Sequence, residues 1–127
     1  LGSALMVGKI AVLDLPTLYE GIMSSSCTSF VHETESQVIM NGSYNINFTM
    51  DLVCKDVGLF DSLANSMDIP TEVSPLIKGI FKKGRQDYGD RAWSSMIVKR
   101  LEDACNTNLR ASGFPEELVD NEAIKKG

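Results

Sequence analysis

The stretch that decides the fold is Thr49-Met-Asp-Leu-Val-Cys-Lys-Asp-Val-Gly-Leu-Phe-Asp-Ser-Leu-Ala-Asn-Ser-Met67. Its apolar residues recur at steps of 4, 3, 4 and 3, which is the spacing of one apolar helix face. The pattern predicts a helix that begins near Thr49 and ends at Asp68-Ile-Pro70. We expect its core-facing residues to be Val53, Val57, Phe60, Ala64 and Met67.

Shorter helical patterns flank this stretch, and Gly, Pro, Ser and Asn separate them. Asp14-Leu-Pro-Thr opens one of them, with Thr17 and Glu20 in the register of a capping box. We therefore expect an all-α helical bundle of residues 1–105 and an extended tail over 106–127. The expected helices are Ala4–Val12, Asp14 to about Ser24, Phe30–Met40 with a stop at Asn41-Gly42, Val73–Lys83 with a stop at Gly84, and Asp90 to Cys105.

Composition argues against two classes of partner. With 127 residues it is long enough for one domain. A net charge of −5 gives no attractive field for nucleic acid. The longest apolar run is Ile10 to Leu13, far below the roughly 20 residues that span a bilayer. We expect neither nucleic acid nor a membrane as a partner.

The cysteines and the single histidine encode no metal centre. Cys27, Cys54 and Cys105 are odd in number and lack a CxxC spacing, which indicates neither a disulfide framework nor a zinc ribbon. His32 would need several carboxylates to hold a metal. We expect no metal and a reducing, cytoplasmic compartment. His32 is expected on a polar helix face with Glu33 and Glu35, and Cys27 is expected to be a plain turn residue rather than a nucleophile.

No glycine-rich loop that would cradle a phosphate is present. The densest basic group, Lys82-Lys83-Gly84-Arg85, is expected to be a helix C-terminus whose cations face the helix dipole, with an anion site as the alternative.

Lys55 and Asp56 place one cation and one carboxylate beside apolar residues. If helical register extends back to Phe48, the 100° step puts Phe48 within about 20° of Lys55, and Leu52 and Leu59 fall on the same side. Such a face suits a polar or anionic ligand that meets an aromatic ring. The alternative is a solvated ion pair on an amphipathic helix, which spacing alone favours.

The same residues carry a family resemblance. Phe48-Thr-Met-Asp-Leu-Val-Cys-Lys-Asp-Val-Gly-Leu-Phe60, followed in order by Ile69-Pro70, Tyr88-Gly89 and Trp93-Ser94, resembles the C-terminal helical domain of the β-hydroxyacid dehydrogenases. That family includes 3-hydroxyisobutyrate dehydrogenase and 6-phosphogluconate dehydrogenase. The similarity covers about residues 4–105, and Cys27 stands where the family usually has glycine.

The resemblance implies roles for three residues. Lys55 matches the lysine that reaches the nicotinamide cofactor, NAD or NADP. Phe48 matches the aromatic residue beside the nicotinamide and the substrate, and Asp56 matches the acid next to that lysine. Nothing in this sequence matches the family's general acid/base lysine, and Lys9 is not assigned to catalysis.

The resemblance also implies a larger enzyme. We expect this chain to be its C-terminal part, with the first helix truncated and the nucleotide-binding Rossmann domain absent. The enzyme would oxidise a small β-hydroxy acid, and the helical part would supply a wall of the cleft and homo-oligomer contacts while lacking activity alone. The alternative is a stand-alone helical module that binds other proteins.

Overall fold

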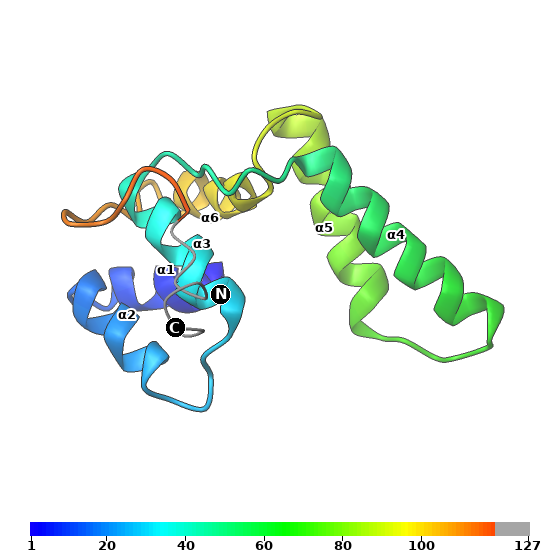
Figure 1. The fold of residues 1–127 in the computed structure, drawn as a ribbon, viewed down its shortest axis with the longest axis horizontal. Helices are drawn as coiled ribbons and strands as arrows, with labels where there is room; N and C mark the ends of the chain where they lie inside the picture. The colour runs from blue at the N-terminus through cyan, green and yellow to red at the C-terminus, as the bar shows by residue number, and fades with distance from the viewer. Residues whose placement is uncertain (119–127) are drawn as a thin grey trace, which may run out of the picture. The chain divides into compact units, whose positions relative to one another are not determined.

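A computed structural model describes residues 1–118 of the chain, and Figure 1 shows it as helices joined by turns and loops. Among these residues no strand forms, and only two isolated β-bridges occur. The all-α fold is therefore confirmed. The elements are α1 (Gly2–Ile10), α2 (Leu15–Met23), α3 (Phe30–Asn41), α4 (Met50–Ser66), α5 (Val73–Tyr88), a 3-10 turn η1 (Ser94–Val98) and α6 (Lys99–Ala104).

The described residues form two compact units. The first contains residues 1–46 and 98–118, and the second contains residues 47–97. Residues 106–118 contain no helix. The rest of the expected tail, 119–127, lies outside the described residues.

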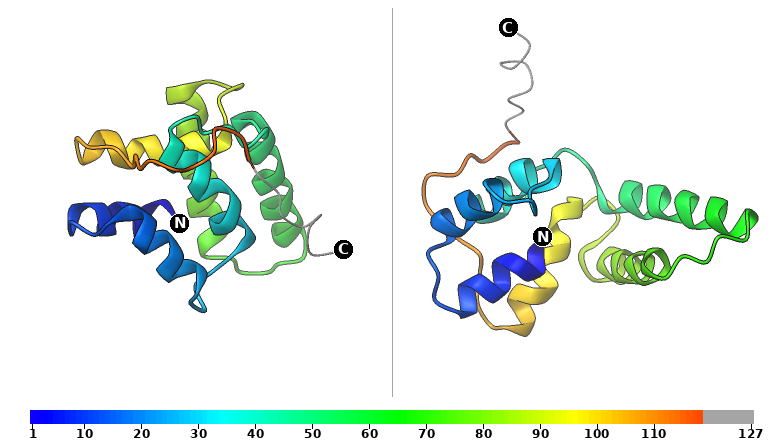
Figure 2. Two further views of the ribbon diagram at one scale, coloured as in Figure 1. Left: turned by 60° about the vertical axis from the view of Figure 1, so that its left-hand side comes forward. Right: turned by 90° about the horizontal axis from the view of Figure 1, so that it is seen from below.

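The first unit is built on α1, α2, α3 and α6 (Figure 2). Helix α2 contacts both α1 and α3, and α1 also contacts α6. Apolar side chains from α1, α2 and α3, with Tyr44 after α3, Val98 at the end of η1 and Leu109 after α6, fill its core. They are Leu5, Met6, Leu15, Tyr19, Val38, Ile39, Met40, Tyr44, Val98 and Leu109.

Two helix ends in this unit are set by local chemistry. Asp14 caps α2, and its carboxylate accepts hydrogen bonds from the backbone N and the hydroxyl of Thr17 at 3.0 and 2.6 Å. Thr17 therefore lies inside the first turn, and the expected capping box of Thr17 with Glu20 was wrong. Helix α3 ends at Gly42, whose φ of 94° is the left-handed stop expected there.

A buried carboxylate fastens residues 107–110 to the first unit. Glu102, which is 5% exposed, accepts from the backbone N of Leu109 at 2.8 Å, Arg110 Nη1 at 3.0 Å and the Tyr44 hydroxyl at 2.5 Å. Burial is the main cause that raises the pKa of Tyr44 to about 12, and the Tyr44–Glu102 hydrogen bond adds to it. The charge of Glu102 is thus matched by a cation and two further donors.

The second unit is a helical hairpin in which α4 and α5 pack along each other (Figure 2). Helix α5 was expected to end at Gly84, and that expectation was wrong. The helix continues to Tyr88 and stops at Gly89, whose φ is 99°. Gly84 is buried, and a Cβ added there would lie 2.4 Å from Ile97 Cδ1 and 3.5 Å from Met50 Sδ. Its role is close packing rather than helix termination.

The predicted core face of α4 was only partly right. Ala64 is buried and Val53 and Val57 are half-buried, but Phe60 is 58% and Met67 55% exposed. Because α5 is the helix that packs against α4 in this unit, α4 buries a narrower part of its surface than a helix inside a larger bundle would. The expected sixth helix also begins later, because residues 90–93 form a loop before η1 and α6.

No helix within residues 1–118 is long and apolar enough to cross a bilayer.

Candidate functional site

The start of α4 is held by the loop that follows α5. The backbone N of Met50 donates to the carbonyl of Ala92 at 2.7 Å, and the backbone N of Ser94 donates to the carbonyl of Phe48 at 2.9 Å. Thr49 and Trp93 form an antiparallel bridge between these bonds. Residues 48–50 and 92–94, about forty residues apart in sequence, therefore bond to each other at the N-terminus of the helix that carries Lys55.

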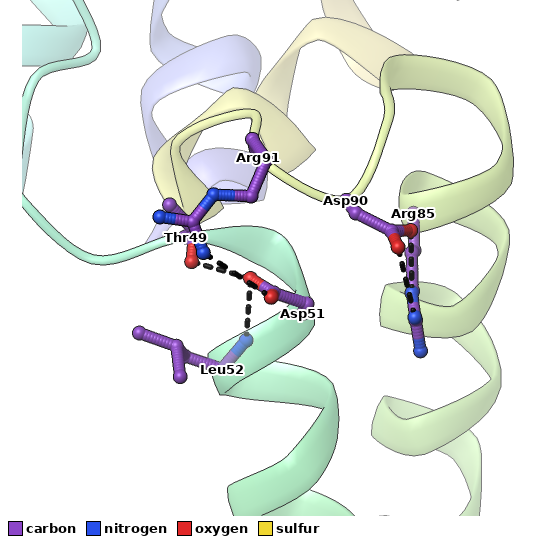
Figure 3. Close-up of polar contacts among 6 residues, drawn as sticks. All are labelled: Thr49, Asp51, Leu52, Arg85, Asp90 and Arg91. Carbon is purple, nitrogen blue, oxygen red and sulfur yellow. Dashed lines mark hydrogen bonds and ion pairs between the residues drawn. The ribbon is translucent and has the colours of Figure 1, made fainter.

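Asp51 completes this helix start with its side chain (Figure 3). One carboxylate oxygen accepts from the Thr49 hydroxyl and, at 3.0 Å, from the backbone N of Leu52. The other accepts from Arg91 Nη1 at 3.4 Å. The Thr49 hydrogen bond is the main cause that lowers the pKa of Asp51 below its usual value. Asp51 is thus ionised at neutral pH and engaged in structure.

A second ion pair joins the end of α5 to the same loop. Arg85 donates from Nε and Nη2 to the two oxygens of Asp90 at 2.7 and 3.1 Å (Figure 3). These hydrogen bonds lower the pKa of the Asp90 carboxyl. The backbone N of Asp51 also donates to the carbonyl oxygen of Asp90 at 3.0 Å, so the loop contacts both helices of the hairpin.

Lys55 and Asp56 lie on α4 beyond this framework. Lys55 Nζ is 3.2 Å from Asp56 Oδ1, and the two side chains are 60% and 53% exposed. The pair therefore forms as a solvated contact, which the spacing favoured. An exposed pair of this kind adds little stability, so both groups are available to a ligand at small cost.

Phe48 stands outside the helix. Helix α4 begins at Met50, and Thr49 before it is extended, with φ of −92° and ψ of 161°. The helical register therefore does not extend back to Phe48, and the condition for placing Phe48 within about 20° of Lys55 is not met. Phe48 is half-buried and precedes the helix, while Leu59, at 63% exposed, continues the Lys55 face along α4.

His32 was expected on a polar helix face, and that expectation was wrong. It is 1% exposed, and its ring lies 4.8 Å from the ring of Tyr19. Nε2 is 3.0 Å from the carbonyl oxygen of Tyr19 and Nδ1 is 2.9 Å from Ser36 Oγ. Both ring nitrogens thus have partners, and His32 is part of the core of the first unit.

Cys27 is exposed in the turn between α2 and α3, as expected. It borders an apolar cavity of about 420 Å³ in the first unit whose lining includes Leu18, Ile22 and His32. No cluster of potential metal ligands occurs among residues 1–118.

The basic group at residues 82–85 was expected at a helix C-terminus. Arg85 lies in the last turn of α5, and Lys82 and Lys83 lie before that turn because the helix continues to Tyr88. Lys83 pairs with Asp87 one turn later, with Nζ 2.9 Å from Oδ2, and Arg85 pairs with Asp90. These cations are therefore partly neutralised, and the group is no isolated anion site.

Sequence reasoning missed the framework of Thr49, Asp51, Asp90 and Arg91. A Thr-x-Asp at a helix start is a weak local signal for a cap. The contact with residues 89–94 is long-range, and no local pattern in one sequence reveals it.

The arrangement presents a cation and a carboxylate on a rigidly started helix, with an aromatic residue before the helix and apolar residues after it. Comparison with known proteins gives this arrangement a family. Residues 1–101 match a family model described as "NAD-binding of NADP-dependent 3-hydroxyisobutyrate dehydrogenase". The chain belongs to this family. The match confirms the family relationship that residues 48–60 indicated.

One curated relative is the 2-(hydroxymethyl)glutarate dehydrogenase of Eubacterium barkeri. It is 31% identical over 114 residues, which are 89% of this chain and 37% of that protein. The chain thus spans little more than a third of the relative's length. The family is one of NAD(P)-dependent hydroxyacid dehydrogenases.

Proposed function

We propose that this chain is the helical part of an NAD(P)-dependent oxidoreductase that acts on a small β-hydroxy acid such as 3-hydroxyisobutyrate. Its role is to form one wall of the active-site cleft and to supply oligomer contacts. The family match over residues 1–101 carries the proposal, and the exposed Lys55 on α4 gives it a contact point.

The residues on α4 fit a nicotinamide cofactor. The Lys55 ammonium has three donors, and within residues 1–118 its ion pair is the exposed contact with Asp56. Displacing that contact costs little, so Lys55 can donate to a ribose hydroxyl, a carboxamide oxygen or a phosphate. Phe48 offers an apolar surface and Asp56 an acceptor for the substrate. A bound nicotinamide cofactor would supply the hydride acceptor for oxidation of the hydroxyl-bearing carbon.

The proposed substrate class rests on the compounds named in the family description and in the name of the curated relative. Both 3-hydroxyisobutyrate and 2-(hydroxymethyl)glutarate contain a hydroxymethyl group on the carbon that bears a carboxylate. They differ in the second substituent of that carbon. We therefore propose a substrate with this shared β-hydroxy acid group, with 3-hydroxyisobutyrate as the first compound to assay.

The test of the proposal is the substitution Lys55→Ala in an enzyme that contains this chain beside a nucleotide-binding domain. Loss of a charge-assisted contact costs about 1.5–3 kcal/mol, or roughly 10- to 150-fold in kcat/KM for the cofactor. Lys82→Ala is the matched control, because Lys82 is an exposed lysine on the neighbouring helix α5. Equal kinetics of the two variants would reduce Lys55 to a solvated surface residue.

A titration of the 127-residue chain with NADH, followed by fluorescence, tests how the cofactor is held. Because this sequence contains no phosphate-cradling glycine loop, we expect no saturable binding below millimolar NADH. Saturable binding at micromolar NADH would show that these helices alone hold the cofactor and would contradict the proposed division of labour.

A further inference from the structure

Arg91 is an exposed cation on the loop between α5 and η1. Its side chain is 79% exposed, although the residues on both sides of it bond to the start of α4. The backbone N of Asp51 donates to the carbonyl oxygen of Asp90 at 3.0 Å. The backbone N of Met50 donates to the carbonyl oxygen of Ala92 at 2.7 Å. The backbone at position 91 is therefore held against α4 while the side chain lies in solvent.

The ion pair that Arg91 forms within residues 1–118 is weak. Nη1 donates to Asp51 Oδ2 at 3.4 Å, which is longer than the roughly 2.7–3.2 Å of a usual hydrogen bond. An exposed pair of this kind adds little stability, so a ligand can replace it at small cost. A guanidinium has five N–H donors in a planar fork, and this fork fits the two oxygens of a carboxylate.

The surroundings of Arg91 leave its guanidinium open to an anion. Its side chain lies over the start of α4, beside Thr49 and Asp51, and apart from the pair that Arg85 forms with Asp90 (Figure 3). Arg85 and Asp90 satisfy each other through two hydrogen bonds. The Asp51 carboxylate also accepts from the Thr49 hydroxyl and from a backbone N–H, which offset part of its charge. An approaching anion therefore meets a cation whose neighbouring carboxylates are already hydrogen-bonded.

Arg91 and Lys55 suit two separate groups of one ligand. Asp51, to which Arg91 donates, lies four residues before Lys55 on α4. A step of four residues keeps the two positions in one row of the helix and about 6 Å apart along its axis. One small carboxylate is narrower than this spacing. A ligand that meets Lys55 with one polar group can therefore meet Arg91 with a second, anionic group.

We propose that Arg91 binds a second carboxylate of the substrate, so that the substrate is a dicarboxylic β-hydroxy acid. This inference rests on the proposed function and narrows its substrate class. Phe48 favours the substrate over a cofactor phosphate as the ligand of Arg91. The backbone N of Ser94, on the segment that follows Arg91, donates to the Phe48 carbonyl oxygen at 2.9 Å. With Phe48 beside the nicotinamide, Arg91 lies near the end of the cofactor that meets the substrate, away from the phosphates.

The experiment compares two substrates in an enzyme that contains this chain beside a nucleotide-binding domain. The compound 3-hydroxyisobutyrate has one carboxylate, and 2-(hydroxymethyl)glutarate adds a second to the same β-hydroxy acid group. Arg91→Gln should raise KM for 2-(hydroxymethyl)glutarate about 10-fold or more and leave KM for 3-hydroxyisobutyrate within about 2-fold, because only the dicarboxylate loses a charge-assisted hydrogen bond. Arg91→Lys keeps the charge without the fork and should give an intermediate KM. Arg100→Gln is the matched control, because Arg100 is exposed on α6 in the other unit, and it should change neither KM.

Several results of these assays would overturn the inference. An equal rise of KM for both substrates in Arg91→Gln would show that Arg91 supports the loop, and a rise of KM for NAD(P)H would assign it to a cofactor phosphate. Unchanged KM values for both substrates would leave Arg91 in solvent. An enzyme that oxidises 3-hydroxyisobutyrate and not 2-(hydroxymethyl)glutarate would overturn the inference and leave the proposed function standing. An enzyme that oxidises neither compound would contradict both proposals.

Discussion

At the scale of single residues, burial distinguishes charged side chains that stabilise the fold from charged side chains that are free to contact a ligand. Glu102 is 5% exposed and all its hydrogen-bond partners lie within the first unit. Lys55 is 60% exposed in side chain and its ion pair is with its own neighbour, Asp56. Removing a buried partner leaves the others unpaired, whereas removing an exposed one leaves water in its place. Glu102 should therefore govern stability, and Lys55 should not.

Substitution of Glu102 by Ala should lower the free energy of unfolding by about 3–5 kcal/mol, because Arg110 and the Tyr44 hydroxyl lose a buried charged partner. Urea unfolding followed by circular dichroism measures this. Tyr44→Phe removes one hydrogen bond and should cost only about 1–2 kcal/mol. A Glu102→Ala variant as stable as Tyr44→Phe would show that the network does not hold residues 107–110.

Tyr44 also predicts a dependence of stability on alkaline pH. Its pKa in the folded state is about 12, above the ordinary tyrosine value of 10.0, so the folded state keeps the proton to higher pH than the unfolded state. This contribution is complete below pH 10 and is lost as the pH rises from about 10 to 12. Absorbance titration should show a tyrosine with a pKa near 12 that disappears in Tyr44→Phe. Normal titration of all tyrosines would contradict the buried hydrogen bond.

At the scale of elements, α5 depends on the absence of a side chain at one of its glycines. A Cβ at Gly84 would meet Ile97 Cδ1 at 2.4 Å, while a Cβ at Gly79 would have nothing within 4 Å. Both glycines lie inside α5, so helix propensity affects them alike. The two positions therefore separate the packing of the hairpin from its intrinsic helicity.

Gly79→Ala should raise the free energy of unfolding by about 0.5–1 kcal/mol, because alanine is the better helix former. Gly84→Ala has the same propensity gain, but Ile97 must move, at an overpacking cost of about 1–3 kcal/mol. Thermal unfolding of the two variants should place Gly84→Ala below Gly79→Ala. Equal stabilisation by both would mean that the contact between Gly84 and Ile97 is loose.

The elements that the sequence predicted well have local causes. The left-handed Gly42 and the long periodic run of α4 each depend on neighbouring residues, and both were located within a residue or two. Gly84 was read as a stop because a single sequence does not show which glycines pack against another segment. The pairing of Thr49 with Trp93 was missed for the same reason, since the two residues are far apart in the chain.

In the candidate site, too, the features with local causes were predictable from the sequence and the long-range contacts were not. Spacing alone identified Lys55 and Asp56 and their solvated contact, because both lie on one helix. Of the five residues that were assigned to the core face of this helix, Phe60 and Met67 are exposed. Periodicity reports that a helix has an apolar side and does not report what covers it.

At the scale of the whole molecule, assembly should determine stability. If the chain forms the proposed oligomer contacts, folding is linked to association, and the melting temperature becomes dependent on concentration. We expect the melting temperature of the chain to rise between 1 and 100 µM. A melting temperature that does not change with concentration would contradict this linkage.

The claim that unites these scales is that α4 presents Lys55 to a nicotinamide cofactor. The most direct measurement is a crystal structure of an enzyme that contains this chain with NAD(P)H bound. The account predicts Lys55 Nζ within hydrogen-bonding distance of the cofactor, about 3 Å, with Phe48 beside the nicotinamide. A cofactor bound with Lys55 still in solvent and paired only with Asp56 would contradict it.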